Sequence, residues 1–356
     1  MKNRLANFEL LRVSAIFLIV LLHSTIYLNI KDTHIISNYV ALSLLKIISS
    51  TGVNLFVILT GYFLLNKADN GIKRTLNLIG IVWFYLVFFA ILYSTFYKSL
   101  SLREVLYAIL PFKYWFINVY LALIILSPYL NKLSSGLTKN EFLNLLLVLF
   151  LSNVVFGNYI GLVNGFSIVW FVNLFMIGNF FHRYDIQIKN NKLIKLFLLI
   201  LCSSFIYNTL KFNGLSIFNR FNDVYFIVSV EGPNNFFSFC LSLTIFMLFS
   251  KISLSEIKSK LVLKISIYSL GVYLIHEDPF IRELIWKNDY ILKYCIDSIW
   301  TPLIIFTYSS IIFLVCVFLE SLRHKMFKIL KYEMFITYLS NKSIQIFNYG
   351  IFTINN

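Results

Sequence analysis

Long, nearly continuous apolar runs recur along this chain and constrain its fold more than any other feature. They lie at residues 9–28, 43–65, 76–97, 113–130, 142–160, 166–181, 193–210, 234–250, 262–280 and 299–319. About 20 apolar residues are needed for an α-helix to cross the hydrocarbon core of a bilayer. The alternating segments of a membrane β-barrel do not occur. The sequence therefore predicts an all-α, polytopic membrane protein with these ten runs as transmembrane helices.

The composition supports a lipid bilayer as the main solvent of this chain. Hydrophobic residues make up 59% of the sequence, charged residues 13%, and the mean hydropathy is +0.78, whereas soluble domains are about 25% charged. A net charge of +15 would suggest nucleic-acid binding in a soluble protein. Here the lysines and arginines concentrate in alternate loops, as the positive-inside rule describes. We therefore expect no nucleic-acid partner, and we expect both termini in the cytoplasm.

No soluble domain interrupts the apolar runs. We expect one membrane-embedded domain over residues 1–320 and a cytoplasmic C-terminal tail over 321–356. The first run is expected to be retained as a helix, because no small-residue cleavage site follows it. Four scattered cysteines show no paired spacing, so we expect neither a disulfide framework nor a metal site.

The first apolar run carries two ionisable residues, Arg12 and His23, which are eleven positions apart. Eleven residues make about three helical turns plus 20°, so both side chains lie on one face, with a rise of about 16 Å between them. A guanidinium suits phosphate or carbonyl oxygens, and an imidazole suits general-base chemistry. A snorkelling arginine and a histidine hydrogen-bonded to a neighbouring helix are the structural alternatives.

The ninth run ends in a second polar group, His276, Glu277 and Asp278. In the orientation set by the basic loops this run travels outward, so His276 lies at a depth close to that of His23. A histidine that ends a helix at the interface is the alternative interpretation.

Two further runs combine small or polar residues with apolar ones. The second run contains Thr60 in "STGVNLFVILTG", which indicates either close helix packing or the wall of a cavity. The fourth run begins with Tyr114 and Trp115, typical of an interfacial aromatic belt. Asn118 and Tyr120 follow and are expected to face a cavity.

Taken together, these stretches resemble the acyltransferase family 3 integral-membrane O-acyltransferases of the polysaccharide O-acetyltransferase type. The family's first helix has an acidic residue, an arginine and, after ten further residues, a histidine; Glu9, Arg12 and His23 match it here. Segments like "VNLFVILTGYFL", "WFINVYLALIILSP" and "GVYLIHEDP" follow in the family's order. The resemblance thus covers nearly the whole chain.

The resemblance implies that the chain transfers an acyl group, usually acetyl, from cytoplasmic acyl-CoA to a hydroxyl of a glycan. The acceptor would be a capsule, exopolysaccharide or O-antigen sugar, at the cell surface or lipid-linked. Acetyl-CoA would be the donor substrate, with no tightly bound cofactor. The setting would be the plasma membrane of a bacterium, and polysaccharide assembly proteins are a further class of expected partner.

The resemblance also implies roles for single residues. His23 would be catalytic, and Arg12 would bind acyl-CoA. The family's Arg-x-x-Arg near the third helix is replaced here by Lys73 and Arg74. Direct transfer and an acyl-histidine intermediate both remain open.

The other site residues are assigned from their expected depth. His276 would assist catalysis by orienting the acceptor, and Thr60 would line the donor cavity. The residues expected to contact substrate are Glu9, Asn118, Tyr120, Glu277 and Asp278.

Two other function classes fit ten spans. A transporter or flippase of a lipid-linked sugar or small metabolite would explain basic residues at the cytoplasmic helix ends. However, the sequence shows no acids at mid-membrane for ion coupling and no inverted repeat. A structural partner in a polysaccharide assembly complex is the third interpretation.

Overall fold

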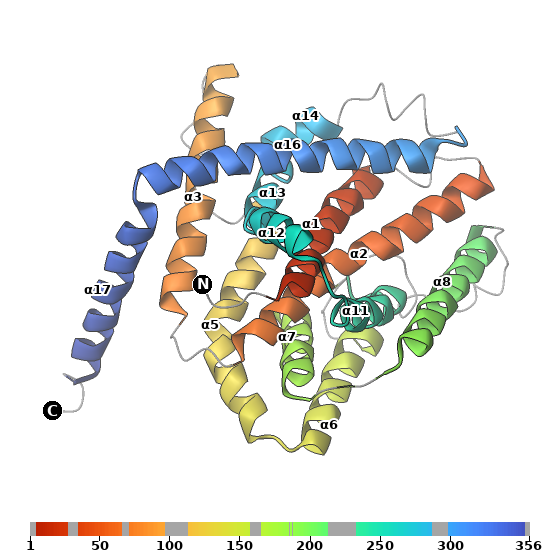
Figure 1. Cartoon of the computed structure of the whole chain (residues 1–356), viewed down its shortest axis with the longest axis horizontal. Helices are drawn as coiled ribbons and strands as arrows, with labels where there is room; N and C mark the ends of the chain where they lie inside the picture. Colours follow the sequence, from red (N-terminus) through yellow and green to blue (C-terminus); the bar gives the residue numbers. More distant parts are fainter. Residues whose placement is uncertain are drawn as a thin grey trace.

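The computed structural model describes residues 5–27, 35–65, 71–96, 113–156, 165–184, 186, 188–212, 233–286 and 298–352, and their regular structure is entirely helical (Figure 1). Within these described residues, six helices are long and apolar enough to cross a membrane. They are α1 (Ala6–Tyr27), α2 (Ile36–Leu64), α3 (Ile72–Phe96), α5 (Trp115–Gly136), α8 (Asn190–Phe212) and α16 (Thr301–Ile329). The predicted all-α membrane fold is confirmed, while the number of ten spans and the side of the termini stay predictions.

Three shorter helices occupy other apolar runs. They are α6 (Lys139–Phe150), which continues into a π-helical turn over Leu151–Val155, α7 (Ile168–Arg183) and α11 (Phe236–Phe249). The start of α6 is fixed by a capping box, in which the Thr138 side chain accepts from the Glu141 backbone and the Glu141 carboxylate accepts in return. The extended residues Leu137 and Thr138 separate α6 from α5.

Small residues let α2 pack closely against two neighbours. A side chain at Gly52 would meet the Ala15 carbonyl of α1, and one at Gly61 would meet the backbone of Phe175 in α7. Helices in lipid associate through such close backbone approach rather than through the hydrophobic effect. On these faces of α2, the packing interpretation of the second run is therefore the correct one.

The ninth apolar run is not one helix, contrary to the expectation of a span over residues 262–280. It is divided among α12 (Glu256–Ser266), α13 (Ser269–His276) and α14 (Pro279–Trp286). Pro279 has no N–H with which to continue α13, and the Asp278 carboxylate instead accepts from the Phe280 backbone N–H at 3.1 Å. This break leaves His276 at the end of a short helix that lies between α1 and α16 (Figure 1).

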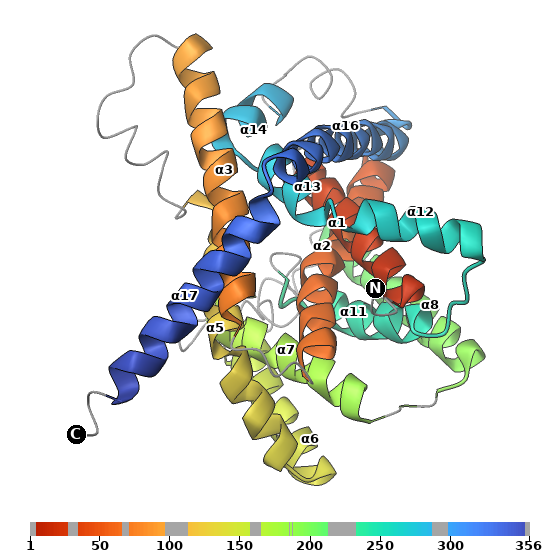
Figure 2. The same cartoon turned by 60° about the vertical axis from the view of Figure 1, so that its left-hand side comes forward.

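The C-terminal part of the chain is helical as well. The boundary expected at residue 320 falls inside α16, which runs on to Ile329. Lys331 then adopts a left-handed φ of 53°, and α17 (Tyr332–Phe352) turns back along α3, as Figures 1 and 2 show. The Tyr332 hydroxyl donates to the Asn77 carbonyl at 3.2 Å, which ties α17 to the first turns of α3.

Candidate functional site

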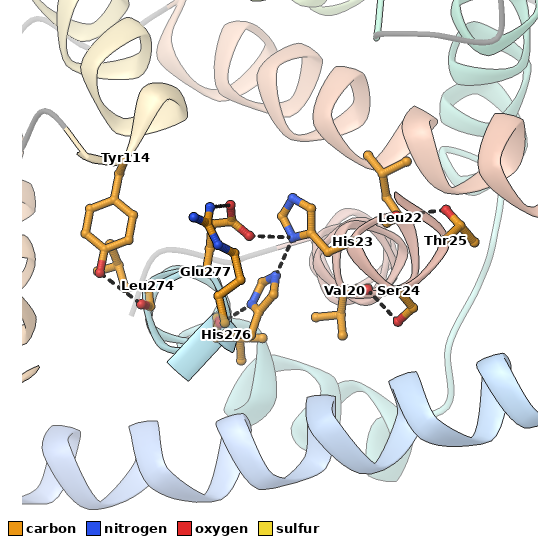
Figure 3. Close-up of polar contacts among 11 residues, drawn as sticks. Val20, Leu22, His23, Ser24, Thr25, Tyr114, Leu274, His276 and Glu277 are labelled. Carbon is orange, nitrogen blue, oxygen red and sulfur yellow. Dashed lines mark hydrogen bonds and ion pairs between the residues drawn. The ribbon is translucent and has the colours of Figure 1, made fainter. Parts of the chain in front are cut away.

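Two histidines from distant parts of the chain meet inside the helix bundle. His23 lies near the end of α1 and His276 at the end of α13, and Nδ1 of His23 is 2.8 Å from Nε2 of His276 (Figure 3). His276 is completely buried and His23 is 9% exposed. The two residues expected at the same depth are thus in direct contact.

The hydrogen-bond partners of the histidines determine their tautomers. Nδ1 of His276 lies 2.5 Å from the Val272 carbonyl oxygen, which can only accept, so the proton of neutral His276 is on Nδ1. Nε2 of His276 then accepts, and Nδ1–H of His23 donates to it. The lone pair of His23 is therefore on Nε2, and this nitrogen points away from both partners in Figure 3.

The Glu277 carboxylate supports the same arrangement. Its Oε2 lies 3.2 Å from Nδ1 of His23, and its Oε1 lies 3.4 Å from a guanidinium nitrogen of Arg282. Tyr27 hydrogen-bonds to both Glu277 and Arg282. An anion beside Nδ1 favours a proton there and stabilises the positive ring that forms when Nε2 takes up a second proton.

His23 borders a cavity of about 180 Å³, here called the histidine cavity. Its described lining residues are Ile19, Leu22, His23, Ile26, Tyr27, Lys46, Ser50, Val53, Trp115, Phe116, Phe166, Pro233, Tyr273 and Glu277. Most of this wall is apolar or aromatic, so water is largely excluded around the histidine pair. Ligand pockets usually measure about 300–1,000 Å³, so this cavity can hold only a small reacting group.

One buried hydroxyl in this wall has no acceptor for its O–H among the described residues. It belongs to Tyr273, which is 5% exposed and lies on the same short helix as His276. The Phe116 backbone N–H, in the first turn of α5, donates to the Tyr273 oxygen, which leaves the Tyr273 O–H free to donate. A buried hydroxyl is normally satisfied, so Tyr273 is a donor available to a group that enters the histidine cavity.

Arg12 occupies the other end of the α1 face that carries His23. Its guanidinium is 2.6 Å from the carboxylate of Glu9 and lies over the Phe63 ring. Glu9 is 3% exposed, so this pair fixes the position of Arg12. The helical rise still separates Arg12 from His23 by about 16 Å.

Three of the other predicted residues gather near Arg12. The hydroxyls of Thr60 and Tyr120 are 3.1 Å apart, joining α2 to α5. Arg12 and Arg74 both lie within electrostatic range of the Tyr120 hydroxyl. The structure therefore brings Arg12, Thr60 and Arg74, three of the residues proposed for donor binding, to one end of α1.

The remaining predicted residues lie elsewhere. The Asp278 carboxylate accepts from Lys113 at 2.9 Å and from Tyr114 at 3.0 Å, so it ties α14 to the start of α5. Asn118 is half-buried on α5 and is not part of the described wall of the histidine cavity. Lys73 is exposed on the first turn of α3.

Sequence reasoning missed Tyr273, Arg282 and Lys46. Tyr273 could have been found, because a residue three positions before His276 shares its helical face. Lys46 had a signal too, as a lysine within the second apolar run. Arg282 had no sequence signal. Its contact with Glu277 depends on the turn between α13 and α14, whereas the sequence predicted a continuous helix there.

The histidine pair also resembles a metal site in composition. Ligand atoms of His23, His276 and Glu277 all lie within 4.8 Å of one another, and two histidines with a glutamate bind zinc in some enzymes. Two nitrogens on one tetrahedral zinc, each about 2.0–2.1 Å from it, would be about 3.3 Å apart. The observed 2.8 Å instead fits a hydrogen bond between the rings.

A family model described as an acyltransferase domain matches residues 5–321. The chain belongs to acyltransferase family 3. The match spans α1 through most of α16 and contains every residue of the histidine site. No curated protein and no solved structure matches the chain. Family membership and the apolar helices together identify a membrane acyltransferase, which decides between the enzyme interpretation and the transporter interpretation.

Proposed function

We propose that this acyltransferase moves an acetyl group from acetyl-CoA to a hydroxyl of a cell-surface or lipid-linked glycan in a bacterial plasma membrane. The observation that carries the proposal is the orientation of His23. Its Nδ1 is held by His276 and Glu277, which leaves Nε2 as a base at the small histidine cavity. This is the arrangement that general-base activation of a hydroxyl requires.

The chemical step follows from that orientation. Nε2 of His23 accepts the proton of the acceptor hydroxyl while the hydroxyl oxygen forms a bond to the thioester carbonyl carbon. The carbon–sulfur bond then breaks, and the CoA thiolate takes the proton from Nε2. His276 and Glu277 act as positioning residues, because they hold the ring and stabilise its transient positive charge.

The negative charge that develops on the carbonyl oxygen needs a donor. The Tyr273 hydroxyl lies in the wall of the same cavity, and its O–H has no acceptor among the described residues. We assign it to this oxygen. A preorganised donor in a site that excludes water stabilises such charge strongly.

The dimensions of the site support a short acyl group. A cavity of about 180 Å³ accommodates an acetyl group and the reacting hydroxyl but not a long chain. Arg12, fixed by Glu9, lies at the side predicted to be cytoplasmic, where acyl-CoA is found. The thin pantetheine arm would cover the interval of about 16 Å along α1.

The glycan acceptor is supported by the family and by the aromatic part of the wall. Trp115, Phe116 and Tyr273 line the histidine cavity and lie toward the end of α1 predicted to be external. Aromatic rings offer large, rigid contact faces with a polar edge, which suits a sugar ring whose hydroxyls project to one side.

The test uses the purified full-length protein with radiolabelled acetyl-CoA and cell-surface glycans prepared from cells that lack the protein. The expected result is release of free CoA that depends on the glycan, together with an acetyl ester on the glycan found by mass spectrometry. His23→Gln is the inactive control. Glycans of identical mass with and without the active protein would contradict the proposal.

The same assay separates the two chemical routes. Label bound to the protein before acceptor is added would establish an acetyl-histidine intermediate. Direct transfer predicts label on the glycan alone.

A further inference from the structure

A second cavity, of about 810 Å³, lies where α3, α16 and α17 meet. We call it the basic cavity. Its basic lining residues are Lys73, Arg74, Arg323, His324, Lys328 and Lys331. The only acid among its described lining residues is Glu333. A hollow lined by one sign of charge concentrates counter-ions, so the basic cavity is suited to a ligand with several negative charges.

Part of this cavity is rigidly built. Two nitrogens of Arg323 donate to the Glu320 carboxylate at 2.9 and 2.6 Å, and the Tyr85 hydroxyl donates to the same carboxylate. Arg323 is 8% exposed and Glu320 is 1% exposed. This buried group anchors the end of α16 against α3, so the wall is fixed rather than formed by mobile surface lysines alone.

Aromatic rings complete the wall beside the cations. The rings of Phe327 and Tyr332 have centroids 4.1 Å apart, and the Arg323 guanidinium lies over Phe327. Both rings line the basic cavity. Cations for phosphates together with aromatic faces for a base are the features that bind nucleotides.

The basic cavity lies at the Arg12 end of the bundle. Phe8, close to Arg12 on α1, packs against Tyr62 near the end of α2, and α3 begins a few residues later. Arg74 and Arg12 also share Tyr120 as an electrostatic neighbour. The side chains proposed to hold the donor and those of the basic cavity are thus neighbours.

The short helix α13 runs from the basic cavity to the histidine pair. Ile267, just before α13, lines the basic cavity, and His276 ends that helix. Nine residues of helical rise amount to about 13 Å, close to the interval from Arg12 to His23. A ligand anchored in the basic cavity can therefore extend an arm toward the histidine pair.

We propose that the basic cavity binds the phosphorylated nucleotide of acyl-CoA and that the C-terminal segment supplies much of the site. The assignment rests on the proposed function. Arg323, His324, Lys328, Lys331 and Tyr332 lie beyond residue 321, where the family match ends. In this chain, α17 and the last turns of α16 are accordingly part of the donor site rather than an appendage.

The test measures binding to the purified full-length protein in nanodiscs, with CoA, adenosine 3′,5′-bisphosphate and pantetheine as separate ligands. The variant is Lys328→Gln with Lys331→Gln, both exposed residues. Its control is Lys258→Gln with Lys264→Gln, two exposed lysines of α12 that do not line the basic cavity. Removal of two exposed charge contacts should weaken the binding of CoA and of the bisphosphate about tenfold. Binding of pantetheine, and binding of all three ligands by the control variant, should be unchanged.

The outcomes separate this inference from the proposed function. If the wild-type protein binds CoA and the cavity variant binds it equally well, the basic cavity is not the nucleotide site, although the acyltransferase proposal stands. If the wild-type protein binds no CoA, both fail. A further arm compares nanodiscs of neutral lipid with nanodiscs containing anionic lipid. If the variant alters only the dependence of thermal stability on anionic lipid, the cavity holds a lipid headgroup and the nucleotide assignment is overturned.

Discussion

The histidine cavity and the basic cavity differ in nearly every physical respect. The histidine cavity has a volume of about 180 Å³, an apolar and aromatic wall, and buried polar groups that are held by specific partners. The basic cavity has a volume of about 810 Å³ and six basic residues in its wall, most of them exposed. The first excludes water and orients single atoms, whereas the second attracts charge. An enzyme that takes a small group from a large, highly charged carrier requires both environments.

The division of roles is tested most strongly at His23. His23→Gln should lower the rate of acetyl transfer by about 10³-fold, since general-base catalysis contributes about 10²–10⁴-fold. CoA affinity should be unchanged, because the proposed nucleotide site is the basic cavity rather than the histidine cavity. His182→Gln, on α7 and outside both described cavities, is the matched control. Transfer near the wild-type rate by His23→Gln would exclude His23 as the base.

Tyr273→Phe removes the proposed donor to the carbonyl oxygen and leaves the ring in place. We expect kcat to fall by about 10²-fold, the lower range for loss of one such donor, with the KM for acetyl-CoA unchanged. A transition-state interaction produces this split between kcat and KM. Tyr129→Phe, at a tyrosine of α5 that is 72% exposed, serves as control. A rise in KM at constant kcat would show that Tyr273 binds the donor instead.

The small histidine cavity should discriminate among acyl donors by length. One additional methylene in a tight pocket changes kcat/KM by about 10–200-fold, so butyryl-CoA should react at least about tenfold less efficiently than acetyl-CoA. Phe116→Ala enlarges the histidine cavity and should reduce the preference for acetyl-CoA over butyryl-CoA. Steady-state kinetics with both donors gives the ratio, and equal efficiency would mean that the cavity does not enclose the acyl group.

Salt should weaken CoA binding at the basic cavity but leave turnover at the histidine cavity nearly unchanged. This is the smallest of the expected effects. Exposed charges are screened over about 10 Å at 0.1 M salt and about 3 Å at 1 M. The Kd for CoA should therefore rise several-fold between these concentrations, while turnover at saturating acetyl-CoA stays nearly constant. Calorimetry and initial rates measure the two quantities. A salt-independent Kd would argue against phosphate binding by exposed lysines.

The relative positions of Arg12, His23 and His276 were largely predictable, because they depend on local helical geometry. The spacing of Arg12 and His23 placed them on one face of α1, and the direction of the ninth run placed His276 at the depth of His23. Both predictions use only the rise and turn of a helix. Even so, the ninth run was wrongly expected to be continuous: Pro279 marks the break between α13 and α14, but no proline marks the break between α12 and α13 at residues 267–268.

The basic cavity was not predictable as a cavity. Lys73 and Arg74 were assigned to the donor, but Arg323 and Lys328 looked like ordinary loop and tail cations of the positive-inside pattern. Their role depends on the path of α17, which the left-handed turn at Lys331 and the contact of Tyr332 with α3 determine. The sequence separates these residues from Lys73 by about 250 positions, and no periodic pattern reports a contact at that distance.

The sequence by itself determined that the chain lies in a membrane, that its fold is helical and which types of reactive group it carries. These properties follow from hydrophobicity and helical periodicity, which can be read within a few tens of residues. Tertiary structure decided which groups meet. It paired His23 with His276 and so left Nε2 of His23 as the nitrogen proposed to act as the base. It left the Tyr273 O–H without an acceptor among the described residues, turned Asp278 into a structural anchor, and joined the C-terminal helix to the cations of α3. Each result depends on side chains from separate helices within hydrogen-bond distance, and only the packed bundle specifies that proximity.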